Sequence, residues 1–218
     1  MVEIKNFEVF NLDRACRAIE NSFNVGDINT TEGAVKEKLA KSLGNNMQPH
    51  QSHDAYLKGI LVTYDIKGSG TFMPEFQRYH HHEIIMSQST MHSMEKFMSG
   101  DNYYDPFTKY VTEETKEQIK KLYNEWHNAK QSEDKELVYN CFMKLIHNLP
   151  RGFELWATVN SNYLQLKTMV IQRAHHPQQE DWGAFVEFCY SLPKFRELCG
   201  FTGEEWNLDK LFPLYKKV

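Results

Sequence analysis

The sequence predicts a single-domain α/β (α+β) fold in which helices surround a central sheet. Residues 3–10 alternate like a strand, and residues 59–66 are rich in β-branched side chains. Residues 112–129 and 132–148 repeat apolar side chains at helical spacing. No repeat, linker or low-complexity tract divides the chain, so we expect one domain over residues 1–218.

Composition describes a globular chain and argues against several classes of protein. Hydrophobic residues make up 41% of the chain and charged residues 25%, and the net charge of -4 argues against a general nucleic-acid binder. No apolar run approaches the roughly 20 residues that span a bilayer. Residues 1–5 show no signal-peptide pattern, and the four cysteines form no paired motif. We therefore expect a cytoplasmic protein with reduced thiols and with no nucleic-acid or membrane partner.

The first strand is predicted to lead into two helices. Asn11 or Asp13 can cap a helix over about residues 12–24, because short polar side chains accept hydrogen bonds from the first free amides of a helix. A short amphipathic helix is expected over residues 33–43. Gly44 marks its end.

A polar loop over residues 49–54 comes just before the second strand. Binding residues often lie on polar loops beside rigid strands, although His53 in this loop also fits an ordinary cap or turn. The second strand is expected to break at residues 68–70. A short helix over residues 71–79 should follow, because Pro74 is tolerated in a first helical turn.

Residues 77–92 are the most unusual stretch of the sequence. They contain three consecutive histidines, a short apolar run, and a segment rich in hydroxyls and amides that ends in a fourth histidine. This mixture suggests a site lined by hydrogen-bonding groups, while a solvated turn or an ordinary structural segment stays equally open. Adjacent histidines on a strand point to opposite faces, whereas zinc ligands converge, so we assign no metal ligand here.

The second half of the chain reads as mainly helical. Thr112 begins a capping-box-like start to the helix 112–129. After an apolar segment over residues 153–159, a polar helix over residues 160–174 is expected to face a site or a subunit interface. Another helix is expected over residues 181–192, and the tail to the last residue is short and helical at best.

Residues 77–92 also carry a resemblance to a known family, the flavin-dependent thymidylate synthases. The family signature R-H-R-x-x-S-x-N-E-x-S-x-R aligns with residues 80–92 without a gap, and the glutamine three positions before it falls on Gln77. Within the signature only His81 is identical. Gln88 and Thr90 stand where the family has glutamate and serine.

Further blocks in the same order support the resemblance, which covers about residues 50–185. Ser52-His53-Asp54 is similar to the family's G-H-E, and Leu149-Pro150 resembles its V-L-P. Asn162 falls on the asparagine of its helix motif N-A-R-S-L, and Arg173 falls on an arginine eleven residues further. Gln179-Glu180-Asp181 falls on its Q-W-E. The fold this implies is that of the flavin-dependent thymidylate synthases, with a central sheet and surrounding helices.

The resemblance implies a homotetramer with shared sites that methylates dUMP with FAD as cofactor, methylenetetrahydrofolate as carbon donor and NADPH as reductant. The flavin-binding positions it implies are His53, His80, His81, His82 and Asn162. The nucleotide-binding positions it implies are Gln77, Ser87, Gln88, Ser89, Thr90, His92 and Arg173. The catalytic positions among these are Arg173, which would hydrogen bond to the base, and Thr90 and Gln88, which would orient the nucleotide.

Several signature charges are missing. His80, His82 and His92 replace arginines, and Ile146 stands where the family has a phosphate-binding arginine. Arginine is always charged and grips phosphate with two hydrogen bonds, whereas histidine is charged only below its pKa, and we expect His80 and His82 to titrate near neutral pH. Each lost charge-assisted bond is worth about 1.5–3 kcal/mol.

These losses leave more than one function open. The first expectation is a divergent enzyme that modifies C5 of a pyrimidine deoxynucleotide. The alternative is a catalytically inactive nucleotide- or flavin-binding homologue that serves as a binding or assembly module. A metal-dependent hydrolase built on the histidine clusters is the third.

Overall fold

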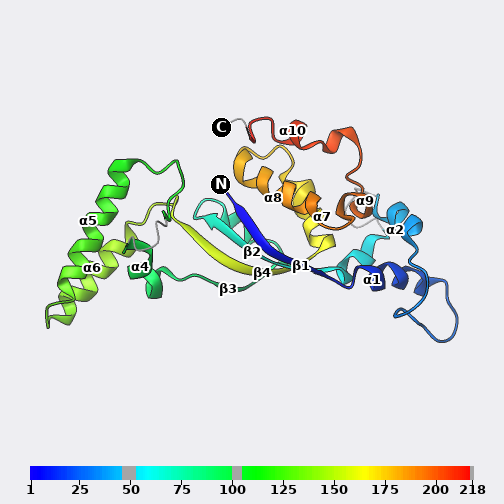
Figure 1. Cartoon of the computed structure of the whole chain (residues 1–218), viewed down its shortest axis with the longest axis horizontal. Coiled ribbons are helices and arrows are strands. Elements are labelled where there is room, and N and C mark those ends of the chain that lie inside the picture. Colours follow the sequence, from blue (N-terminus) through cyan, green and yellow to red (C-terminus); the bar gives the residue numbers. More distant parts are fainter. Residues whose placement is uncertain (46–52, 100–104, 217–218) are drawn as a thin grey trace.

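The computed structural model describes residues 1–45, 53–99 and 105–216. Within these ranges the chain forms a four-stranded antiparallel sheet in the order β1-β2-β4-β3 (Figure 1). The strands are β1 (Glu3–Phe10), β2 (Leu61–Ser69), β3 (Glu83–Ser87) and β4 (Glu154–Asn162). Helices combined with an antiparallel sheet make an α+β fold, as the sequence predicts.

The helices lie on one face and at both ends of the sheet (Figure 1). Those above the face are α7 (Tyr163–Arg173), α8 (Gln179–Ser191), α9 (Phe195–Cys199), η3 (Glu204–Trp206) and α10 (Leu208–Leu211), and α3 (Met73–Phe76) packs against α8. At one end lie α1 (Leu12–Ala18), η1 (Ile19–Ser22), α2 (Glu37–Gly44) and η2 (Asp54–Gly59). At the other end α4 (Thr90–Met98), α5 (Glu113–Ala129) and α6 (Lys135–His147) form a helical arm.

Strand alternation gives the sheet one apolar face and one polar face. Val62, Tyr64 and Ile66 point from β2 toward α7 and α8 and are fully buried, because successive side chains on a strand point to opposite sides. The intervening Thr63 and Asp65 lie on the opposite side, where they hydrogen bond to Asn160 and Thr158 of β4. Figure 1 shows no helix of the described residues over this side, which we call the open face.

Two hydrophobic clusters hold the molecule together. The larger one lies between the sheet and the helices above it, and its fully buried side chains include Trp182 and Phe185. The smaller one joins the helical arm to the start of β4. Its buried members are Met94, Phe97, Ile119, Leu122, Leu145 and Phe153.

Several predicted elements are confirmed. The first strand has the predicted bounds. The helix predicted from Thr112 begins at Glu113, and the Thr112 side chain caps it by accepting a hydrogen bond from the Thr115 amide at 3.3 Å. The helix predicted at 181–192 begins slightly earlier, at Gln179.

Other predicted bounds are wrong. The second strand does not break at residue 68, because Gly68 pairs with Leu155 and β2 continues to Ser69. The helix expected over 12–24 ends at Ala18 and continues as a 3-10 turn. The helix expected over 132–148 begins at Lys135, because Asp134 caps it.

The polar helix expected over residues 160–174 needed the largest correction. Residues 160–162 belong to β4, where they pair with β2, and the Asn162 side chain caps α7. Five side chains of α7 are buried in the chain's own core, among them Lys167. Its ammonium lies 2.7 Å from Asp54 Oδ2 and 2.8 Å from the Gly44 carbonyl oxygen. The polar character of this helix therefore reflects an internal ion pair as well as exposed positions.

No helix in the described ranges combines the length and apolar character needed to cross a membrane.

Candidate functional site

The three consecutive histidines lie in different environments. His80 and His81 are exposed in the turn before β3, and His81 has a left-handed backbone with φ of 56°. His82 is 5% exposed, and its ring packs edge-on against Phe76 with ring centroids 4.0 Å apart. Neither of its ring nitrogens has a hydrogen-bond partner among the described residues. His82 therefore packs as a core side chain.

Burial sets the charge of His82. It lowers the pKa of the imidazole to about 3, because the interior solvates a cation poorly. The ring is therefore neutral at physiological pH. The expectation that His82 titrates near neutral pH is wrong, and His82 supplies no positive charge to a diphosphate there.

The strand β3 separates the three histidines from the polar segment that follows it. Glu83 pairs with Asn160 and Ser87 pairs with Ala157, so the histidines lie toward the Asn162 end of β4 and the following polar segment lies toward its start. The five-residue strand spans roughly 17 Å at about 3.3 Å per residue. Within one chain the histidines thus lie at the opposite end of β3 from the nucleotide-binding positions Ser87, Gln88, Ser89 and Thr90.

The flavin-binding positions near the first end also include Asn162 and His53. The Asn162 side-chain oxygen accepts from the Gln165 amide at 3.0 Å, which leaves its NH2 group as a donor. His53 is exposed directly before η2. Ser52 of the same sequence block lies outside the described residues.

The nucleotide-binding positions at the Ser87 end of β3 connect the sheet to the helical arm. Gln88 bonds twice to Trp156, through its backbone amide at 2.8 Å and through its side-chain oxygen at 2.9 Å. Ser89 is the N-cap residue of α4, and Thr90 is the first residue of that helix. His92 is exposed on the same helix.

Ser87 and Gln88 line a groove of about 300 Å³ on the open face, which we call the Trp156 groove. Its other lining residues are Lys5, Asp65, Met86, Trp156, Ala157 and Thr158. The Lys5 ammonium lies 4.0 Å from the centre of the Trp156 ring. Hydrogen bonds from Asn6 and Thr158 lower the pKa of the Asp65 carboxyl, so the groove contains one cation and one anion.

Arg173 is the one nucleotide-binding position that supplies a permanent cation, and it lies on the other side of the sheet. Its Nε donates to the Tyr79 hydroxyl at 2.8 Å, and its Nη1 lies 3.1 Å from Glu75 Oε2. The guanidinium also stacks over Trp182 at 4.5 Å. These partners all lie on the helix-covered side, so one chain does not bring Arg173 together with Gln88. Gln77 is nearby in sequence and exposed at the end of α3.

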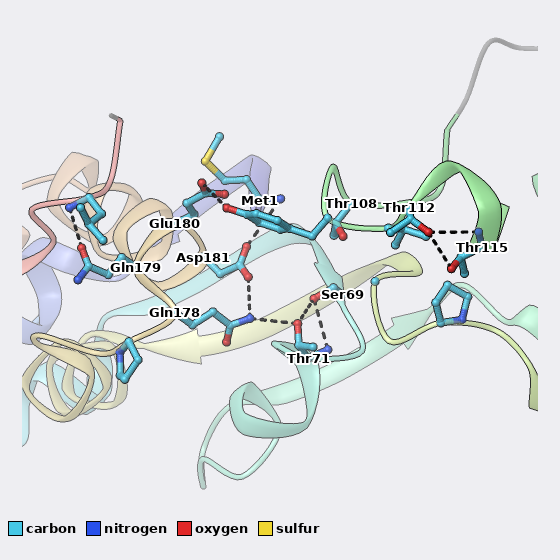
Figure 2. Close-up of a pocket in the computed structure, with 16 residues that line it drawn as sticks. Met1, Ser69, Thr71, Thr108, Thr112, Thr115, Gln178, Gln179, Glu180 and Asp181 are labelled. Carbon is cyan, nitrogen blue, oxygen red and sulfur yellow. Dashed lines mark hydrogen bonds and ion pairs between the residues drawn. The ribbon is translucent and has the colours of Figure 1, made fainter. Parts of the chain in front are cut away.

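A larger cavity of about 550 Å³ lies beside the first turn of α8 and contains none of the expected site residues (Figure 2). We call it the acidic pocket, because Glu180 and Asp181 line it. Gln178 donates to both Thr71 and Asp181, at 3.0 and 2.8 Å. Lys109 and Tyr110 each donate to one oxygen of Glu180 at 2.8 Å.

Charge decides what the acidic pocket can bind. Burial raises the pKa of Glu180, but the hydrogen bonds from Lys109 and Tyr110 outweigh it, and the net shift is downward. The Lys109 ammonium lies 2.8 Å from Glu180 Oε1, and the N-terminal ammonium of Met1 lies 3.8 Å from Asp181 Oδ1. The pocket therefore presents paired charges to a ligand. In the sequence, the only sign of this pocket is the resemblance of residues 179–181 to the family's Q-W-E.

Among the described residues, no group of three or more histidine, cysteine, aspartate or glutamate side chains is arranged to hold a metal ion.

Comparison with known proteins identifies the fold. No family model matches the sequence, and no curated protein matches it. Two solved structures of the flavin-dependent thymidylate synthase of Helicobacter pylori, each with FAD and dUMP, match the structure. The first has a TM-score of 0.62 and 15% identity, over 91% of this chain and 96% of that chain. The second has a TM-score of 0.60 and 17% identity, over 91% and 95%. The chain therefore has a flavin-dependent thymidylate synthase-like fold, as the resemblance implied.

Proposed function

We propose that this chain is a divergent flavin-dependent thymidylate synthase-like protein of the cytoplasm, which binds FAD and a pyrimidine deoxynucleotide such as dUMP and modifies C5 of the base. The observation that carries the proposal is the match over 91% of the chain to two structures that hold FAD and dUMP. Methylenetetrahydrofolate as carbon donor and NADPH as reductant belong to the same proposal.

The residues present fit a flavin through hydrogen bonds more than through charge. His53, His80 and His81 are exposed, and the Asn162 NH2 group is a donor near the same end of β4. These side chains would hold the ring system and the ribityl chain, while the buried neutral His82 would only shape the wall. When bound, the flavin supplies the redox chemistry. Because the matched arginines are absent, we expect weaker binding of the FAD diphosphate.

The nucleotide site requires more than one copy of the chain. Gln88, Ser89 and Thr90 lie at the arm end of the sheet, whereas Arg173 lies under the helices. A homotetramer in which one copy supplies Arg173 and another supplies the Gln88 segment would complete the site. In it, a guanidinium hydrogen that Glu75 and Tyr79 do not use would donate to a base carbonyl, and Gln88 and Thr90 would orient the nucleotide.

A second candidate, a catalytically inactive binding or assembly module, is favoured by one specific observation. Arg173 already makes an ion pair with Glu75, a hydrogen bond to Tyr79 and a stack over Trp182 within its own chain. An arginine satisfied in this way contributes to folding whether or not a nucleotide binds.

Two measurements separate the candidates. The purified protein is titrated with FAD by flavin fluorescence, and the loaded protein is then incubated with NADPH, methylenetetrahydrofolate and dUMP labelled with tritium at C5. Saturable FAD binding with tritium release is the expected result. FAD or dUMP binding without release would establish the module, and absence of binding to either would contradict both candidates.

Light scattering tests the shared site. We expect a particle of four chains, each of 25.7 kDa. A monomer at micromolar concentration would contradict the division of the site between copies.

A further inference from the structure

Trp156 presents an aromatic surface on the open face of the sheet. It lies in β4 between two lysines, with the Lys5 ammonium 4.0 Å and the Lys67 ammonium 5.7 Å from its ring centre. Lys67 is balanced by Glu3 at 2.9 Å and Glu154 at 3.9 Å. In the described part of the chain, no carboxylate oxygen lies within 4.0 Å of the Lys5 ammonium. Lys5 is therefore an exposed cation that lies over a ring, and its electrostatic partner is the Asp65 carboxylate of the neighbouring strand, whose pKa it helps to lower.

The groove around Trp156 has the size and chemistry of a small-ligand site. Its volume of about 300 Å³ is at the lower end of the range for ligand pockets. The Trp156 ring offers a stacking surface, and every nucleobase has a face that can stack on it. Ser87 and the Gln88 NH2 group offer donors, and the ionised Asp65 offers an acceptor for an N–H group.

The groove also supplies a cation beside Ser87 and Gln88, in a chain whose signature has lost its arginines. His80, His82 and His92 stand where the family has arginines, and His82 is buried and neutral. Lys5 comes from β1, far outside the matched blocks, yet it shares the groove with Ser87 and Gln88. A lysine ammonium binds phosphate as a point charge.

We infer that the Trp156 groove is a nucleotide subsite in which the pyrimidine ring stacks on Trp156 and the Lys5 ammonium moves from the ring to the phosphate. Asp65 accepts a hydrogen bond from an N–H group of the base, which favours uracil-type bases that carry N3–H. Lys5 and Asp65 are cross-strand partners, so the Lys5 ammonium would lie between the phosphate and the Asp65 carboxylate and offset their repulsion. This inference rests on the proposed function, because it names residues for the same nucleotide.

Calorimetric titration with dUMP and with deoxyuridine, which lacks the phosphate, tests the two roles separately. Lys5→Ala is expected to weaken dUMP binding at least tenfold and to leave deoxyuridine binding unchanged. Lys5→Arg is expected to restore dUMP binding, because it restores the cation. Trp156→Leu is expected to weaken both ligands about tenfold or more, and Trp156→Phe to weaken them less, because it keeps a stacking surface.

Matched variants control for unspecific effects. Lys121→Ala removes an exposed lysine from the arm helix α5 and is expected to change neither affinity. Circular dichroism and melting curves establish that each variant is folded. If Trp156→Leu fails to fold, the two Lys5 variants still test the inference, because Lys5 is exposed and its replacement should not affect folding.

The outcomes distinguish this inference from the proposed function. If the wild-type protein binds dUMP and the Lys5→Ala variant binds it equally well, the subsite is wrong while the proposed function survives. If Lys5→Ala weakens dUMP and deoxyuridine alike, Lys5 does not bind the phosphate and the inference is overturned. Wild-type protein that binds neither ligand would overturn the subsite and the nucleotide part of the proposed function together.

Discussion

Lys167 and His82 are both polar side chains buried in the same hydrophobic core, and they differ in whether they have partners. Lys167 is 2% exposed and bonds to the Asp54 carboxylate and the Gly44 carbonyl. His82 is 5% exposed, and neither ring nitrogen has a partner among the described residues. Buried polar groups normally have hydrogen-bond partners. The Lys167 ion pair therefore connects parts of the fold, whereas burial of the unpartnered His82 costs free energy of folding.

The strongest test of this comparison removes the partner of Lys167. Asp54→Ala leaves a lysine ammonium buried without its carboxylate, so we expect the free energy of unfolding to fall by about 3–5 kcal/mol. Urea denaturation of the wild type and the variant measures the change. A loss below 1 kcal/mol would mean that water or another group replaces the carboxylate readily.

The double variant Asp54→Leu with Lys167→Met is the matched control. It replaces both charges by apolar groups of similar size, and such exchanges of buried ion pairs are often neutral or stabilising. We therefore expect it to be more stable than Asp54→Ala. Equal losses in the two variants would show that packing around residue 54, and not charge, sets the effect.

Arg173 is an intermediate case, because its side chain is 18% exposed and has partners. Arg173→Ala removes the bonds to Glu75 and Tyr79 and the stack on Trp182, so we expect a loss of about 2–3 kcal/mol. Arg173→Lys keeps a charge for Glu75 and should lose less. Thermal unfolding with calorimetry measures both, and an unchanged melting temperature for Arg173→Ala would assign the residue to ligand binding alone.

The sequence predicted the parts of the fold that local chemistry decides. The Thr112 cap and the alternation of residues 3–10 are local signals, and both elements appear as expected. The strand continued through Gly68 because pairing with Leu155 overrides a local turn signal. Long-range pairing of this kind cannot be seen in one segment.

The site was harder to predict, for two physical reasons. The Trp156 groove joins Lys5 of β1, Asp65 of β2 and Trp156 of β4, and strands that are neighbours in space are distant in sequence. The resemblance assigns all three histidines to the flavin, although adjacent side chains near a strand point to different sides. That rule indicates that at least one histidine faces inward. Which one it is depends on the left-handed backbone at His81, which the structure shows and the sequence does not.

The unpartnered His82 also predicts how acid affects stability. Its folded-state pKa of about 3 lies below the unfolded value of about 6.5, so the unfolded chain binds the proton more readily between these values. The His82 contribution is thus constant above about pH 6.5 and is lost as the pH falls toward 3. Between pH 7.5 and pH 5 this loss amounts to about 2 kcal/mol. Urea denaturation of the wild type and of His82→Phe at both pH values measures this loss as the difference between the two proteins, because they share all other titrating groups. If the stability of both proteins depends on pH equally, the imidazole of His82 is not buried and neutral.

The smallest expected effect is the gain from replacing His82 by an apolar ring at pH 7.5. The two ring nitrogens lose their water on folding and gain no partner among the described residues, a cost of about 1–3 kcal/mol for a neutral polar group. Phenylalanine removes this cost but is slightly larger, and it must fit against Phe76 with ring centres now 4.0 Å apart, so part of the gain is lost to crowding. We therefore expect His82→Phe to raise the free energy of unfolding by about 1 kcal/mol, measured by urea denaturation, and His82→Leu to show whether crowding limits the gain. If His82→Phe lowers stability while His82→Leu raises it, crowding by the larger ring outweighs the gain from removing the imidazole nitrogens. If both lower it, the imidazole makes a stabilising contact, and its removal should then also be followed by FAD titration.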